Sequence, residues 1–119
     1  MKKKILLLIA LNCFFFANAQ VATNGGSGLN PAYPDLATAI TALNGATITD
    51  PVVITLTGNE TAPVGGYEIT AQGDAVNTIV IQGVTSTVMA SDVLVIGSVT
   101  DAIFKLAGAD YITLQNFTM

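Results

Sequence analysis

The sequence predicts a mainly β protein, built either as a solenoid of stacked short strands or as a small β-sandwich. The segment from Gln20 to Met119 is rich in Val, Ile and Thr, with 15 Thr, and these are the residue types that strands prefer. Within that segment, short runs of alternating apolar and polar residues recur between turns that carry Gly, Asn or Asp.

A weak internal repeat favours the solenoid. The run TIVIQG at Thr78–Gly83 matches YITLQN at Tyr111–Asn116 in residue type, 33 positions further along, and VVITLT at Val52–Thr57 is a looser copy. Periods of about 20 to 50 residues are typical of solenoids, in which each repeat buries its apolar face against the next one. A β-sandwich also needs closely spaced short strands, so it stays the alternative.

The first 19 residues have the three regions of a secretory signal peptide. Lys2–Lys4 form a positive start, Ile5–Leu11 are almost wholly apolar, and Ala17-Asn18-Ala19 places small residues where a signal peptidase reads them. The apolar stretch is shorter than the roughly 20 residues that a spanning helix needs. We therefore expect a secreted or cell-surface protein that begins at Gln20 after cleavage behind Ala19, with no membrane span.

The remaining segment is acidic and almost without basic residues. Three of the four basic residues lie in the signal peptide, so Lys105 alone stands against eight carboxylates, a net charge of about −7. Nucleic acid and anionic lipid are bound through Lys and Arg, so neither is an expected partner. The chain has no His, and its single cysteine, Cys13, falls in the signal peptide, so no disulfide or thiolate metal site is expected.

One helix is predicted, after a leader. Residues 20–33 contain the glycine-rich run Asn24–Gly28 and are expected to be flexible. Pro34–Leu43 predicts a helix, because Pro34 suits a first helical position and Asn44-Gly45 supplies a stop. Its apolar residues recur on one helical face at Leu36, Ile40 and Leu43.

Everything after the helix is predicted to be short strands. In order, these are Val52–Thr57, Tyr67–Thr70, Thr78–Gln82, Thr87–Met89, Val93–Ile96, Ile103–Leu106 and Tyr111–Met119. Alternation assigns an inner and an outer face to each strand. The residues expected to line one continuous interior are Ile54, Ile79, Ile81, Ile112 and Leu114.

Four stretches resemble right-handed parallel β-helix proteins of the pectin-lyase-like superfamily: YPDLATAITAL, DPVVITLTGN, NTIVIQG and DAIFKLAGADYITLQNFTM. The resemblance implies that residues 34–119 form a helix that caps the coil and its first rungs. The signal peptide ending in ANAQ is similar to those of exported proteins that carry a type IX sorting domain at their far C-terminus. Since members of the family have many rungs, we expect this chain to be an N-terminal fragment truncated at its C-terminus.

The family includes polysaccharide lyases, glycoside hydrolases and esterases, but the residues for such chemistry are sparse. A lyase needs a positioned base, and Lys105 is expected on the outer face of a strand. A glycosidase needs two carboxylates at a fixed separation. Six of the carboxylates are expected at turns or strand starts, where an Asp side chain commonly accepts hydrogen bonds from nearby backbone groups. They are Asp50, Glu60, Asp74, Asp92, Asp101 and Asp110. Neither Asn59 with Glu60 nor Asp74 with Asn77 resembles a calcium loop.

We therefore predict no catalytic, cofactor-binding or metal-binding residues in this chain. It is expected to be the non-catalytic N-terminal segment of an extracellular β-helix protein that binds or processes polysaccharide or serves as a surface adhesin. The alternative function is a secreted carbohydrate-active enzyme, either a polysaccharide lyase or a glycoside hydrolase. Polysaccharide and cell-surface components are the expected partners, and an uncovered last strand would make the truncated chain self-associate.

Export gives the first test. Expressed in a Gram-negative host, the chain should be recovered with Gln20 at its N-terminus, because Ala17-Asn18-Ala19 is the site that a signal peptidase cleaves behind. N-terminal sequencing of the exported protein measures this. Material that begins at Met1, or that carries lipid on Cys13, would contradict the assignment.

Overall fold

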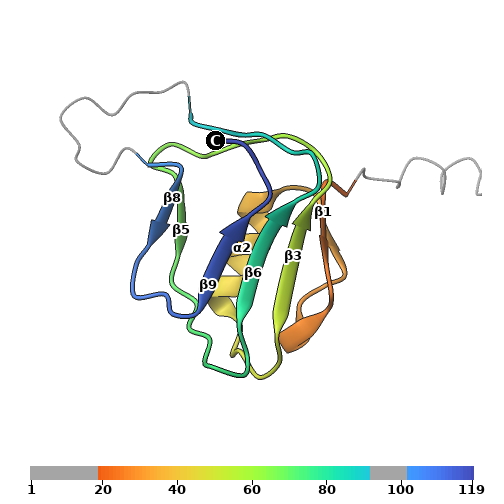
Figure 1. Cartoon of the computed structure of the whole chain (residues 1–119), viewed down its shortest axis with the longest axis vertical. Coiled ribbons are helices and arrows are strands. Elements are labelled where there is room, and N and C mark those ends of the chain that lie inside the picture. The colour runs from red at the N-terminus through yellow and green to blue at the C-terminus, as the bar shows by residue number, and fades with distance from the viewer. Residues whose placement is uncertain (1–18, 92–101) are drawn as a thin grey trace, which may run out of the picture.

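The structure, a computed structural model, describes residues 19–91 and 102–119 and is shown in Figure 1. Its strands form three small sheets beside one α-helix, α2 (Leu36–Gly45). The other elements are β1 (Val21–Thr23), the short 3-10 helix η2 (Gly26–Gly28), β2 (Ala32–Tyr33), β3 (Val52–Leu56), β4 (Glu60–Thr61), β5 (Tyr67–Ile69), β6 (Ile79–Gly83), β7 (Val88–Met89), β8 (Phe104–Leu106) and β9 (Ile112–Gln115). Residues 1–18 of the predicted signal peptide and the predicted strand Val93–Ile96 lie outside the described residues.

The largest sheet has the strand order β2-β1-β3-β6-β9. In it, β3, β6 and β9 run parallel and in register, so Ile54 lies opposite Ile81, and Ile81 lies opposite Leu114. The three copies of the sequence repeat are thus three neighbouring strands of one sheet. The two smaller sheets are also parallel pairs, β4 with β7 and β5 with β8.

The predicted architecture is wrong. The described residues form neither the coil of a right-handed parallel β-helix nor a β-sandwich, but a small mixed-sheet domain with three small sheets and one helix. The sheet is mixed because residues 20–33, predicted as a leader, contain β1 and β2, which pair antiparallel with each other and with β3. Alternation and repeats report which faces are buried and which strands resemble one another, but they carry no information on how separate sheets are joined.

The interior is lined as the alternation predicts. Ile54, Ile79 and Ile81 are fully buried on the inner faces of β3 and β6. On β9, Ile112 and Leu114 are half-buried and pack against the same apolar cluster. The observed burial therefore confirms the predicted inner faces of β3, β6 and β9. Burial decreases at β9, the last strand of the sheet.

The helix begins two residues later than predicted and ends two residues later. Asp35 is its N-cap, and its Oδ1 accepts a hydrogen bond from the Thr38 backbone N–H at 2.7 Å. A carboxylate in this position satisfies one of the free N–H groups of the first turn and favours the positive end of the helix. The predicted apolar face is buried at Leu36, Ile40 and Leu43.

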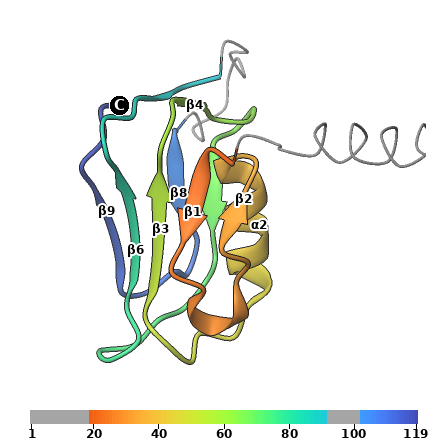
Figure 2. The same ribbon diagram turned by 90° about the vertical axis from the view of Figure 1, so that its right-hand side faces the viewer.

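The end of α2 is fixed to the neighbouring sheet by one side chain. Asn44 donates from Nδ2 to the Glu68 carbonyl at 2.8 Å, and its Oδ1 accepts from the Thr70 N–H at 2.9 Å. Figure 2 shows the result: α2 lies at the end of the domain that holds β1 and β2, and β9 lies at the opposite end. The helix thus closes one end of the interior.

The face assignment can be tested at neighbouring positions of β6. Replacing Ile81 with Ala should lower the free energy of unfolding by about 2–5 kcal/mol, because it leaves a cavity in the buried cluster. The matched control is Val80→Ala on the other face of the same strand, which is half-buried and should cost about 1 kcal/mol. Urea unfolding followed by circular dichroism gives both values. Equal losses at the two positions would show that β6 does not have one inner face.

Candidate functional site

The two ends of the interior are covered differently. At one end lie α2, β1 and β2, whereas β8 and β9 are the last strands of their sheets at the other end (Figures 1 and 2). We call residues 103–106 and 111–119 the open layer. It contains the C-terminal edge that the sequence predicts to be uncovered.

The backbone of β9 has hydrogen-bonding groups that face no described strand. In a parallel pair, alternate residues of a strand direct both their N–H and C=O groups toward the same neighbour. The Ile79 N–H donates to the Tyr111 carbonyl at 3.0 Å, which places Tyr111 and then Thr113 in the set that faces β6. The N–H and C=O groups of Ile112 and Leu114 therefore point away from β6.

The same pattern holds on β8, in the second sheet. The Tyr67 N–H donates to the Ile103 carbonyl at 2.8 Å, and the Ala107 N–H donates to the Ile69 carbonyl at 2.9 Å. The groups of Phe104 therefore point away from β5. Leu106, predicted to point inward, is 53% exposed. Among the described residues, the open layer thus has two strands that each pair with another strand along one edge only.

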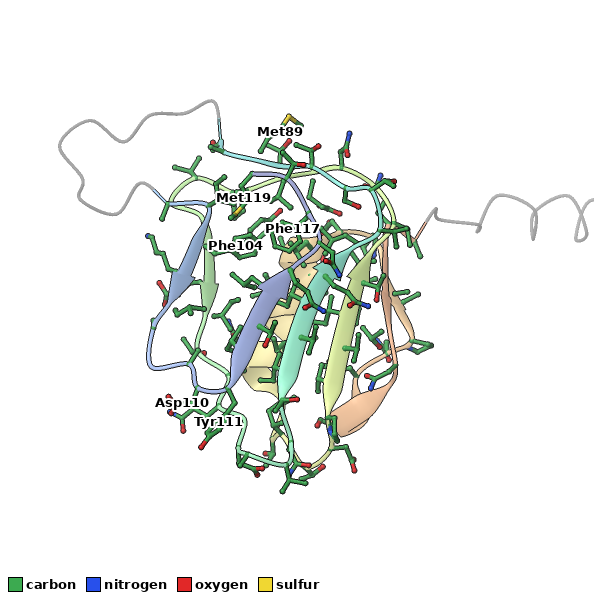
Figure 3. The ribbon with its side chains drawn as sticks, viewed as in Figure 1. Met89, Phe104, Asp110, Tyr111, Phe117 and Met119 are labelled. Atoms are coloured by element: carbon green, nitrogen blue, oxygen red, sulfur yellow. The ribbon has the colours of Figure 1, made fainter. Side chains whose placement is uncertain are left out.

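An aromatic stack connects the buried interior to the open layer. The rings of Tyr67 and Phe104 are 5.3 Å apart between centroids, and those of Phe104 and Phe117 are 5.7 Å apart. Tyr67 is buried, whereas Phe104 and Phe117 are half-buried. In Figure 3, the Phe104 and Phe117 side chains lie between β8 and β9. Both pack against the buried apolar cluster.

A glycine positions Phe117. A Cβ atom at Gly83 would lie 2.7 Å from the Asn116 carbonyl oxygen and 2.8 Å from the Phe117 Cβ, so no larger residue fits at the end of β6. Asn116 turns the chain with a φ of 61°, a conformation that Asn accepts more readily than most residues. The close approach at Gly83 and the turn at Asn116 direct Phe117 toward Phe104.

Side-chain hydrogen bonds cross the outer face of the same sheet. Gln82 donates from Nε2 to the Thr55 hydroxyl at 3.3 Å, and Gln115 donates from Nε2 to Gln82 Oε1 at 3.1 Å. These residues are in register on β3, β6 and β9. The polar faces of the strands therefore reinforce the alignment that their apolar faces require.

Most of the side chains considered as calcium ligands, and not predicted to form a site, have structural partners. Asp74 accepts from the Asn77 and Val76 N–H groups at 2.8 and 2.7 Å and from Asn77 Nδ2 at 3.0 Å, and these hydrogen bonds hold the pKa of its carboxyl below the ordinary value. Asn59 Oδ1 accepts from the Thr87 N–H at 2.9 Å. These side-chain oxygens thus accept hydrogen bonds that hold a turn and a strand in place.

The other predicted candidates are separated from one another. Lys105 lies in the middle of β8 opposite Glu68, on the outer face. Asp50 and Asp110 are exposed, and Asp92 and Asp101 lie outside the described residues. In the part of the chain that the structure describes, no three His, Cys, Asp or Glu side chains are grouped to hold a metal, and no cavity is present.

Glu60 is a buried carboxyl that the sequence did not single out as buried. It begins β4, is 7% exposed, and its Oε1 has no hydrogen-bond partner in the described structure. Burial raises the pKa of Glu60, and the Asp35 charge adds to this, while the Leu36 backbone N–H opposes it. Only the tertiary packing of β4 beside the start of α2 buries this residue, so no local pattern could have identified it.

Tyr67 shares this acidic environment. Burial, followed by the negative charges of Glu60 and Asp35, raises its pKa to about 12. Its hydroxyl donates to the Thr61 carbonyl at 3.1 Å. The phenol therefore stays protonated and serves as a hydrogen-bond donor at the base of the aromatic stack.

Comparison of the chain with family models, curated proteins and solved structures finds no match. The resemblance to the pectin-lyase-like superfamily therefore stays a prediction. Among the residues that the structure describes, none of the helices has the length and apolar character needed to cross a membrane.

The raised pKa of Glu60 predicts a pH dependence of stability. The folded state binds the Glu60 proton more tightly than the unfolded state, whose carboxyl has an ordinary pKa of 4.5, so this residue contributes stability at low pH that is lost as the pH rises through the folded pKa. Glu60→Gln cannot ionise and should remove that loss. Thermal melts from about pH 4 to about pH 8 measure it, with Glu68→Gln at the exposed position of β5 as the control. Parallel curves for wild type and Glu60→Gln would contradict the assignment.

Proposed function

We propose that this chain is a non-catalytic assembly module of an exported protein, and that its working surface is the open layer, which accepts an additional β-strand beside β9. One observation carries the proposal. The outward N–H and C=O groups of Ile112 and Leu114 lie beside half-buried apolar side chains, whereas α2 covers the other end of the interior.

Free edges of this kind recruit other strands unless something protects them. Proteins usually protect an edge with a charge, a proline or a bulge, but residues 111–119 contain no charged residue, no Pro and no Gly. When a strand is added, main-chain hydrogen bonds supply affinity and the side-chain contacts on each face supply specificity. The composition of this edge therefore supports binding through the backbone.

The structural uses of the carboxylates support the non-catalytic part of the proposal. Asp35 caps α2, and Asp74 closes the turn before β6. The predicted signal peptide supports a role outside the cytoplasm, and the resemblance to the pectin-lyase-like superfamily implies a parent protein that binds or processes polysaccharide or serves as an adhesin.

Proline at position 114 tests the strand-accepting edge. The Leu114 N–H has no partner within the sheet, so Leu114→Pro should keep the pairing with β6 and remove a donor that an added strand needs. The matched control is Leu114→Ala, which also removes the side chain but keeps the N–H group. Light scattering on the exported chain, from micromolar to near-millimolar concentration, should show association of the wild type and of Leu114→Ala, and a monomer for Leu114→Pro.

Amide hydrogen exchange gives an independent measurement on the wild type. The Ile112 and Leu114 amides should exchange quickly in the dilute monomer and slowly in the associated state, because strand addition gives both a partner. If both amides are protected in a chain that stays monomeric at every concentration, the edge is covered from within and the proposed function is wrong.

A further inference from the structure

We infer that the strand which β9 accepts is β9 of a second copy of this chain, paired antiparallel about a two-fold axis at Thr113. The inference rests on the proposed function and names its partner. It follows from the order of the outward backbone groups, from the absence of charge along the edge, and from the apolar side chains beside it.

The outward groups are arranged symmetrically about Thr113. In an antiparallel sheet, residues that form a hydrogen-bonded pair exchange both of their N–H···O bonds. With Thr113 opposite its counterpart, Ile112 of each copy lies opposite Leu114 of the other. Every outward donor and acceptor of the two strands is then used, in about four backbone hydrogen bonds.

Neighbouring registers fit less well. A shift of two residues in one direction places Ile112 opposite Asn116, whose φ of 61° turns the chain out of the extended conformation. A shift of two residues in the other direction places Leu114 opposite Asp110, an exposed carboxylate at the turn before β9. Only the register centred on Thr113 keeps both paired segments within the strand.

Charge favours this segment as the contact between two copies. The part of the chain that follows the predicted signal peptide carries about −7, which disfavours contact over most of the surface. Residues 111–119 have no charge, so two copies can approach along them with little repulsion. The central contact pairs one exposed Thr113 with another, and Thr–Thr pairs across strands are favourable.

The apolar side of the edge is also self-complementary. Ile112 and Leu114 are half-buried on the inner face, and each lies opposite the other residue type across the two-fold axis. Phe104 and Phe117 belong to the same open layer and pack against the same buried cluster (Figure 3). A two-fold contact brings two such layers together, so that each covers the apolar side chains of the other, as in an isologous interface.

Opposite charges at Thr113 test the two-fold axis directly. The Thr113 side chain is exposed and its backbone groups face β6, so Thr113→Lys and Thr113→Glu should leave the fold intact. Alone, each variant places like charges opposite each other and should weaken the dimer about tenfold or more. An equimolar mixture pairs Lys with Glu and should restore the dimer. Thr41→Lys and Thr41→Glu, at an exposed position of α2, are the matched controls and should dimerise like the wild type.

Sedimentation velocity on the exported chains measures all of these states. A heterodimer that forms only from the mixed Thr113 variants supports the inference. In a second outcome, the wild type associates, its Ile112 and Leu114 amides are protected, and the Thr113 variants behave like the wild type. The edge then accepts a different strand or register, so the inference is overturned and the proposed function stands. If the wild type does not associate at all, the inference is overturned, and the exchange of the same two amides then decides the proposed function separately.

Discussion

The parallel, in-register ladder of β3, β6 and β9 is the constraint on which the rest of the domain depends. Because side chains alternate along a strand, a shift of one residue would move every apolar side chain to the wrong face. The ladder prevents this by aligning Ile54, Ile81 and Leu114 inside and Thr55, Gln82 and Gln115 outside. Both sets form contacts across the strands, so the polar and apolar faces select the same register.

The two ends of the ladder differ among the described residues. Beside β3, β1 pairs antiparallel, and α2 is fixed to β5 of the second sheet through Asn44. Among the described residues, no strand pairs with the other edge of β9. The burial of the apolar side chains therefore decreases from the helix toward the open layer.

The sequence predicts the local features of this structure well, because those features depend on periodicity. Alternation identifies the inner faces of β3, β6 and β9, and the apolar spacing of Leu36, Ile40 and Leu43 identifies the helix. It also indicates an edge without charge. The features that it does not predict are tertiary: the antiparallel pairing of β1 with β3 joins residues 31 to 35 positions apart, and the burial of Glu60 depends on where β4 meets α2. The same limit explains the incorrect architecture.

The spacing of the ladder also has a kinetic consequence. Opposite residues are separated by 27 positions between β3 and β6 and by 33 between β6 and β9, so each pairing must close a long loop before any of its contacts stabilise it. Chains with such distant contacts fold slowly, and their intermediates expose strand edges for longer. The strands β6, β7, β8 and β9 each pair with a strand that precedes them by 27 to 37 positions, so this part of the domain can form in chain order. The strand added last then always has the exposed edge. Whether a folding chain pairs with itself or with another chain therefore depends on how fast the next strand arrives compared with how often two chains meet.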